Sequence, residues 1–128
     1  MLFRSIKNQI KKAVVEELTA KVMGSGRLDV FATPAMVAMM EEAAHTSVEA
    51  ELEEGQGTVG TSMTVSHLAA TPVGMEVTCE SELVEVDGRK LVFEIKAMDE
   101  AGLIGEARHE RFIIENEKFL AKTNAKLK

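Results

Sequence analysis

The strongest constraint in this sequence of 128 residues is a change of hydrophobic period near residue 55. Residues 33–52, "TPAMVAMMEEAAHTSVEAEL", have the spacing of a helix that buries one side. Beyond Gly55 and Gly57 the chain instead alternates apolar and polar residues, in stretches separated by tight turns. One long helix followed by several alternating strands predicts a helix packed on an antiparallel sheet.

The helix has start and stop signals of its own. We expect Thr33 to be its N-cap and Pro34 to occupy the first helical position, where the missing N–H costs nothing. The glycines of "EEGQG" end it.

Strands are expected on both sides of the helix. In 57–67, Val59, Thr61, Met63 and Val65 are expected on one side of a strand. The turns "DG" at 87–88 and "DEAG" at 99–102 join the later strands. The other expected segments are a short amphipathic helix or arm through Leu2, Ile6 and Ile10, a strand over 11–23, a break at 24–26, strands over 75–86, 90–99 and 103–115, and a helical segment over 116–127.

This order predicts an α+β protein with the hotdog fold, in which a curved antiparallel sheet wraps around a long central helix. We expect one domain over 1–128, with an N-terminal arm at 1–11 and a C-terminal helical tail at 117–128. Such a sheet has exposed edges, and pairing of two chains edge to edge is a common remedy. A homodimer is therefore expected, with a tetramer as a further possibility.

The amino-acid composition excludes several classes of function. The net charge is −6, and the sequence has no Trp or Tyr and only five Phe, which argues against binding of nucleic acid. No apolar run approaches the roughly 20 residues of a membrane span, and "MLFRSIKNQIKK" is not a secretory signal. Cys79 is the only cysteine, so a disulfide within the chain is impossible, and a metal site is not expected. These features favour the cytoplasm.

Glu41 is the first candidate for chemistry. It lies in one helical row with Val37, Ala44 and Val48, which should be buried, whereas Glu42 lies in a polar row. A carboxylate withdrawn from water has a raised pKa and is a candidate base or nucleophile. The plain alternative is a solvated residue at the border of a wide helix face.

Three further residues have both a structural and a functional interpretation. Thr33 needs no role beyond capping, yet its hydroxyl lies on the same side of the helix as Glu41 and could orient a substrate or a water. His67 ends a strand at the rim of the sheet, where catalytic side chains are common, or is an exposed loop residue. Gly60 lies inside a strand, where glycine often marks a close approach of the backbone. His109 is expected on a charged strand face.

The segments "VFATPAMVAMMEEAA", "GTVGTSMTVSHLAATPVG" and "ARHERFII" together resemble the thioesterase family typified by fluoroacetyl-CoA thioesterase. The similarity covers about residues 12–116. It implies hydrolysis of an acyl thioester by a threonine, a glutamate and a histidine, which match Thr33, Glu41 and His67.

The resemblance also implies residues that bind or support the substrate. Gly60 matches the substrate-contacting glycine, and Arg111 matches an arginine that supports the site or the CoA end. Phe31 is expected to line the site. The segment "TAKVMGSGRLDV" has no aromatic residue, unlike the lid of the fluoroacetyl-specific enzyme, which argues against fluoroacetyl selectivity.

The function expected is therefore hydrolysis of a short-chain acyl-CoA, with coenzyme A as part of the substrate and no other cofactor. Glu41 could act as nucleophile or as general base, and the sequence does not choose between them. One alternative is a non-catalytic module that binds acyl-CoA or an acyl carrier. Another is a hotdog dehydratase or hydratase, whose usual His-containing helix motif is absent here.

Overall fold

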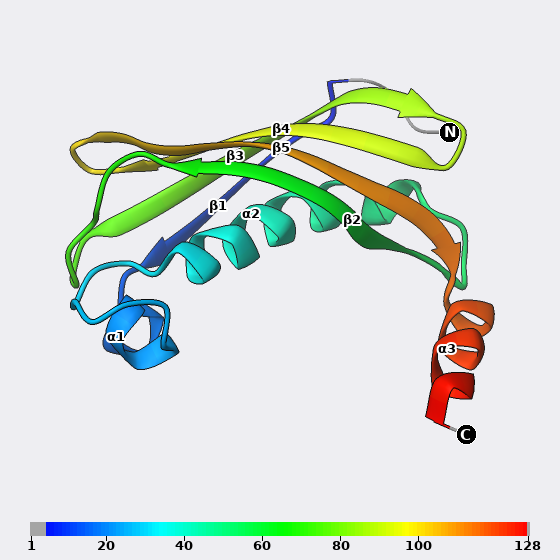
Figure 1. Cartoon of the computed structure of the whole chain (residues 1–128). Coiled ribbons are helices and arrows are strands. Elements are labelled where there is room, and N and C mark those ends of the chain that lie inside the picture. Colours follow the sequence, from blue (N-terminus) through cyan, green and yellow to red (C-terminus); the bar gives the residue numbers. More distant parts are fainter. Residues whose placement is uncertain (1–4, 128) are drawn as a thin grey trace.

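A five-stranded antiparallel sheet curves over one long helix in the computed structural model of the chain, which describes residues 5–127 (Figure 1). The strand order is β1-β3-β4-β5-β2, which confirms the predicted hotdog arrangement. The strands are β1 (Lys7–Ala13), β2 (Gln56–His67), β3 (Glu76–Asp87), β4 (Lys90–Asp99) and β5 (Gly102–Glu115). The α-helices are α1 (Ala20–Met23), α2 (Thr33–Val48) and α3 (Asn116–Asn124), and short 3-10 turns are η1 (Glu16–Leu18), η2 (Glu49–Glu51) and η3 (Ala125–Leu127).

The central helix α2 buries small and flexible apolar side chains against the sheet. Its fully buried members are Ala35, Met36, Met39, Met40, Ala43, Ala44 and Val48. The helix is found in the predicted segment, but α2 ends at Val48 and η2 follows it, so the predicted end at "EEGQG" is several residues too late. The predicted cap is also wrong. Ala32 is the N-cap and makes no side-chain hydrogen bond, and Thr33 is already the first helical residue.

Helix α2 lies off-centre on the sheet. It packs mainly on β3, β1 and β4 and less on β2 and β5. Polar bonds anchor it on the β1 side. The Asn8 side chain donates to the Ala43 carbonyl at 3.0 Å and to the Thr46 hydroxyl at 2.9 Å, and the Ser81 hydroxyl donates to the Ala43 carbonyl at 3.1 Å. The inner side of β2 and β5 is consequently less covered.

The N-terminal segment differs from its prediction. The strand expected over 11–23 instead covers Lys7–Ala13, where it pairs with β3, and the rest of 11–23 holds η1 and α1. The sequence predicts a short amphipathic helix or arm through Leu2, Ile6 and Ile10. No helix forms near Ile6 and Ile10, because this stretch pairs with β3 at the sheet edge, and Leu2 lies outside the described residues. The break at 24–26 is confirmed, since Gly24 ends α1 with φ of 81°.

A β-bulge divides strand β2. Gly60 pairs with Arg111 and Ser62 with Glu110, so Thr61 is an extra residue in β2. Thr58 and Gly60 contact inner-face groups, as do the partly buried Met63 and Val65 that pack on the core. The predicted common side for Val59, Thr61, Met63 and Val65 is therefore wrong in its first half.

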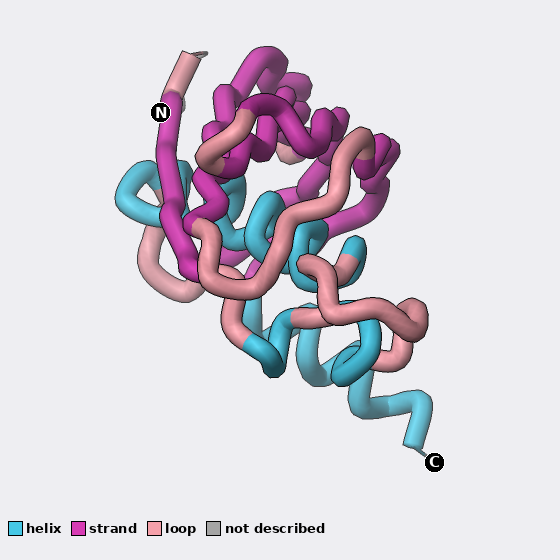
Figure 2. The backbone as a smooth tube through the Cα atoms, turned by 90° about the vertical axis from the view of Figure 1, so that its left-hand side faces the viewer, coloured by secondary structure: helices cyan, strands magenta, loops and turns pink. Residues whose placement is uncertain are grey.

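The strand-to-strand turns are confirmed. Gly88, in the β3–β4 turn, has φ of 61°. The Asp99 carboxylate accepts from the amides of Ala101 at 2.8 Å and Gly102 at 3.1 Å in the β4–β5 turn. Strands and α2 form two layers in Figure 2, and α3 continues from β5 away from the sheet, in the predicted helical region. Within residues 5–127, no helix has the length and apolar character to cross a bilayer.

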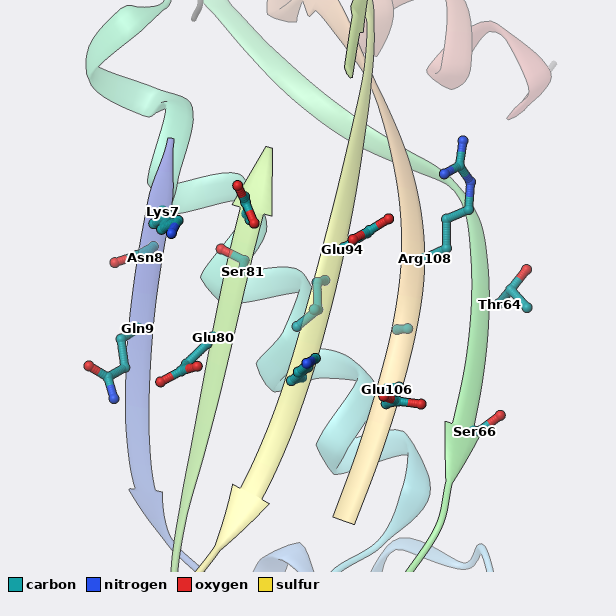
Figure 3. A pocket seen from close by; sticks show the side chains of 14 residues that line it. Lys7, Asn8, Gln9, Thr64, Ser66, Glu80, Ser81, Glu94, Glu106 and Arg108 are labelled. Atoms are coloured by element: carbon teal, nitrogen blue, oxygen red, sulfur yellow. The ribbon is translucent and has the colours of Figure 1, made fainter. Parts of the chain in front are cut away.

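The outer face of the sheet, opposite α2, is polar (Figure 3). A shallow hollow of about 1070 Å³ there is lined by side chains of both charges, among them Lys7, Glu80, Glu94, Glu106 and Arg108. Mixed charge of this kind is expected where one face of an antiparallel sheet meets water. The side chains that could take part in a reaction lie on the other face of the sheet.

Replacing Asn8 tests the anchoring of α2. Asn8→Ala removes two hydrogen bonds between β1 and α2 and should lower the free energy of unfolding in urea by about 1–2 kcal/mol. Gln9→Ala, at the exposed neighbour on the same strand, is the matched control and should change it by less than about 0.5 kcal/mol. Equal losses in the two variants would contradict the anchoring role.

Candidate active site

Thr33 and His67 form the first of two polar groups on the inner side of the sheet. The Thr33 hydroxyl lies 2.7 Å from Nδ1 of His67, so the first residue of α2 is joined to the last residue of β2. This contact explains why Thr33 does not cap the helix: its hydroxyl is engaged with an imidazole instead of a backbone amide. Capping therefore does not account for this threonine.

The other ring nitrogen of His67 has no partner. In residues 5–127, Nε2 of His67 is the one buried side-chain nitrogen or oxygen without a hydrogen bond. Burial lowers the pKa of His67 and outweighs an interaction with the Ala69 backbone that raises it, so the ring is neutral near pH 7. An unsatisfied buried polar atom is costly, and a natural protein retains one where it meets a ligand or a water.

Glu41 belongs to the second group. The Arg111 guanidinium donates to the Glu41 carboxylate at 3.3 Å, and Nε2 of His109 lies 4.0 Å from the same oxygen. A Cβ added to Gly60 would come within 2.8 Å of that oxygen, so a larger residue at this position would displace the carboxylate from its place. The close backbone approach predicted at Gly60 is thus found beside Glu41.

The predicted burial of Glu41 is wrong in the single chain. The side chains of Glu41 and Glu42 are each 42% exposed. Glu41 is exposed because α2 lies off-centre and leaves the border along β2 and β5 open. Their neighbours distinguish them. Glu42 faces the exposed Lys12 at 2.9 Å, whereas Glu41 faces an arginine whose side chain is only 8% exposed. Glu41 is therefore the member of the pair that contacts buried charge.

Arg111 and His109 support Glu41 from β5. Arg111 also donates from Nε to the Thr58 hydroxyl at 2.9 Å and from Nη2 to the Thr58 carbonyl at 3.1 Å. Its Nη1 lies 3.0 Å from Nε2 of His109, whose Nδ1 lies 2.8 Å from the Ser62 carbonyl. Burial lowers the pKa of Arg111 and the Glu41 carboxylate opposes that shift, while burial also lowers the pKa of His109.

His109 is a residue that the sequence analysis assigned wrongly. It is 1% exposed and lies on the inner side of β5, not on a charged outer face. The alternation of β5 could have revealed this position. Residues two apart in a strand lie on the same face, and His109 and Arg111 alternate with Ala107 and Ile113, which pack on the core.

Within one chain the two groups stay apart. Thr33 and Glu41 are eight residues apart on α2, a rise of about 12 Å, and Gly60 and His67 are about 23 Å apart along β2. His67 makes no ion pair with Glu41. Phe31 is 2% exposed and belongs to the core next to α2.

Within residues 5–127, neither a reactive thiol nor a cluster of metal-ligating side chains competes with these groups. Cys79 is buried, and burial raises the pKa of its thiol to about 12, so the thiol is not a nucleophile near pH 7. The described part of the chain contains no group of three or more His, Cys, Asp or Glu side chains arranged to hold a metal ion.

Similarity to solved structures shows the class of protein to which this chain belongs. A Thermus thermophilus member of the thioesterase superfamily superposes with a TM-score of 0.90 at 28% identity, covering 98% of this chain and 93% of that one. The fold and the polar groups along α2 and β2 thus place the chain among hotdog-fold thioesterases, which are thioester hydrolases.

A narrower match follows. The family model for fluoroacetyl-CoA-specific thioesterase matches residues 14–117. A fluoroacetyl-CoA thioesterase from Streptantibioticus cattleyicolor is 45% identical over 98 residues, which are 77% of this chain and 70% of that protein. The structure of the fluoroacetyl-CoA thioesterase FlK superposes with a TM-score of 0.93 at 35% identity and 98% coverage of both chains. The chain belongs to the fluoroacetyl-CoA-specific thioesterase family.

The buried His109 predicts a pH dependence of stability. Its pKa is lower in the folded chain than the value of about 6.5 expected on unfolding. Below that pH the unfolded chain takes up a proton that the folded chain does not, so the free energy of unfolding falls as pH falls. His109→Gln should weaken this dependence in urea titrations between about pH 5 and 8. Parallel curves for the parent and His109→Gln would contradict it.

Proposed function

We propose that this protein hydrolyses a short-chain acyl-CoA thioester, with Thr33, Glu41 and His67 as its catalytic residues. The observation that carries the proposal is the buried, unpartnered Nε2 of His67, on a ring already held by Thr33. The substrate itself brings the coenzyme A, and no further cofactor is required. The single buried thiol suits a reducing cytoplasm.

A relative supports acyl-CoA as the substrate class. A mutant of the fluoroacetyl-CoA-specific thioesterase FlK was crystallised with fluoroacetate and CoA, and its structure superposes with a TM-score of 0.88 at 35% identity, covering 92% of this chain and 99% of that one. Fluoroacetate and CoA are the two products of thioester hydrolysis in that protein.

Glu41 supplies the carboxylate in either of two routes. As a nucleophile, it attacks the thioester carbonyl, the C–S bond breaks, and water then cleaves the resulting anhydride. As a general base, it takes a proton from water while that water attacks the same carbonyl. Arg111 keeps the carboxylate in place by a bond at 3.3 Å, and Gly60, which has no side chain, lets that carboxylate approach the backbone of β2.

His67 handles the proton. Thr33 holds Nδ1, so Nε2 is free to meet a water or the departing thiolate, which must gain a proton. The backbone amides at the start of α2 lie next to Thr33 and can stabilise the oxyanion that forms on the carbonyl.

The acyl group is short and need not carry fluorine. The segment 19–30 before α2 has no aromatic residue, and Phe31 is buried in the core. A selectivity built on an aromatic lid is therefore not expected in this chain.

Paired variants of the two glutamates test the site. With acetyl-, propionyl-, butyryl- and fluoroacetyl-CoA, thiol release should fall by about 10²–10⁴ in Glu41→Gln and in His67→Ala. Glu42→Gln is the matched control, equal in exposure, and should stay within about twofold of the parent.

Two results would overturn this assignment. Turnover by Glu41→Gln equal to that of the parent would remove the carboxylate from the mechanism. Absence of turnover by the parent with every acyl-CoA, combined with thermal stabilisation by CoA esters, would favour a binding module.

We further propose that the active form is a dimer paired through β2. Both sheet edges are open in one chain, but β1 carries Lys7, Lys11 and Lys12, which discourage pairing. Strand β2 has no lysine, arginine or carboxylate in its 12 residues, and its inner side chains Met63 and Val65 are only partly buried. A second copy would cover them, and two such dimers could in turn form a tetramer.

Dimerisation would also complete the site. Antiparallel pairing of two β2 strands about Met63 sets His67 of one protomer opposite the stretch near Gly60 of its partner. Since Gly60 lies beside Glu41, each site would combine Thr33 and His67 from one chain with Glu41 from the other.

Mixing two inactive variants distinguishes a shared site from a site within one chain. Glu41→Gln and His67→Ala, refolded together, should regain up to about a quarter of the parent activity, because half of the dimers are mixed and one of their two sites is intact. Each variant alone, taken through the same refolding, is the control. Activity that stays at the level of the separate variants would contradict the shared site.

A further inference from the structure

We propose that His109 is a positioning residue of this site: as a neutral imidazole, it accepts a hydrogen bond from Arg111 and thereby directs the guanidinium onto Glu41. The inference rests on the proposed role of Glu41. His109 itself acts only through Arg111, and the resemblance to the thioesterase family implies no role for it.

The hydrogen bonds of His109 determine which nitrogen carries the proton. Nδ1 lies 2.8 Å from the Ser62 carbonyl, which can only accept, so Nδ1 is protonated. Nε2 lies 3.0 Å from Nη1 of Arg111, which can only donate, so Nε2 is bare. The two neighbours together select the neutral Nδ1–H tautomer.

Arg111 in turn has a defined partner for each side of its guanidinium. The two hydrogens of Nη1 serve His109 at 3.0 Å and Glu41 at 3.3 Å, while Nε and Nη2 bind Thr58. Because the guanidinium is planar, these bonds fix its orientation. If Nε2 of His109 carried a proton, that N–H would face the N–H of Arg111 Nη1. The two donors would repel each other, and the guanidinium would turn away from Glu41.

The surroundings of the ring favour this neutral form. The charged groups facing it are Arg111 on its own strand and Glu41 of α2, with Nε2 4.0 Å from the Glu41 carboxylate. From β4 it meets the ring of Phe93, with centroids 6.2 Å apart, and from β2 the uncharged Ser62 carbonyl. Burial and the Arg111 charge lower the pKa of His109, and Ser62 and Glu41 only partly oppose them.

Two amide variants separate positioning from packing. The Gln side chain can bring an oxygen to the place of Nε2 and accept from Arg111, whereas the shorter Asn reaches only the place of Nδ1 and can serve Ser62. We expect His109→Asn to lower kcat about 10- to 100-fold with KM within about twofold, because Glu41 is misplaced. His109→Gln should stay within about threefold of the parent.

A spectroscopic readout tests the same idea independently of turnover. Nitrogen-15 NMR of labelled histidines should show His109 as the Nδ1–H tautomer near pH 7. The Glu41 carboxyl carbon signal should shift in His109→Asn toward its position in Arg111→Met, and stay near the parent position in His109→Gln. If the parent hydrolyses no acyl-CoA, the proposed function fails, but these signals still decide how Glu41 is held.

Several outcomes would overturn the inference. They are an Nε2–H tautomer or an imidazolium at His109 near pH 7, equal losses of kcat in His109→Asn and His109→Gln, or a Glu41 signal unmoved by His109→Asn. Retention of kcat by Gln but not by Asn, with the Nδ1–H tautomer, supports it.

Discussion

The off-centre packing of α2 is the constraint on which the rest of the structure depends. Bonds from Asn8 and Ser81 to the helix backbone hold α2 over β1, β3 and β4. The border along β2 and β5 is left partly open. Both polar groups of the candidate site lie on that border. A side chain there can have a buried partner on one side and an accessible substrate on the other.

Burying Arg111 and His109 there costs desolvation free energy. A network of hydrogen bonds among these two residues, Thr58 and Glu41 offsets that cost. Arg111 finds acceptors on Thr58, His109 and Glu41, and the neutral His109 adds no second charge. Within residues 5–127, Glu41 is the one carboxylate in ion-pair contact with Arg111. Such a network is stable only when every member is satisfied, which makes the position of Glu41 part of the stability of β5 as well as of the site.

Much of the fold could be predicted because local pattern and tertiary structure agree over 33–48 and 75–115. Gly88 and Asp99 also mark their turns by local chemistry alone. The prediction failed over most of 11–23, where β-branched residues suggested a strand but only residues up to Ala13 pair with β3, and beyond them Thr19 forms a single isolated bridge with Phe31. A strand needs a partner, and the sequence does not show where the sheet edge ends.

The sequence proposes members for the candidate site but does not show how they are arranged. Thr33, Glu41, His67, Gly60 and Arg111 all came from the resemblance or from their position in the pattern. The burial expected for Glu41 assumed that the whole helix face meets the sheet, and the sheet covers only part of it. His109 was missed because its charged neighbours concealed the alternation of its strand.

The sequence by itself determined the periods: a helix of period 3.6, strands of period 2, and the turns between them, because these depend on each residue and its near neighbours. Only the tertiary structure decided which groups meet, because that depends on register. The extra residue Thr61 is the clearest case. It reverses the faces of β2 partway along the strand, so that Gly60 and His67, seven residues apart, both lie on the inner side, and nothing in the local pattern announces it.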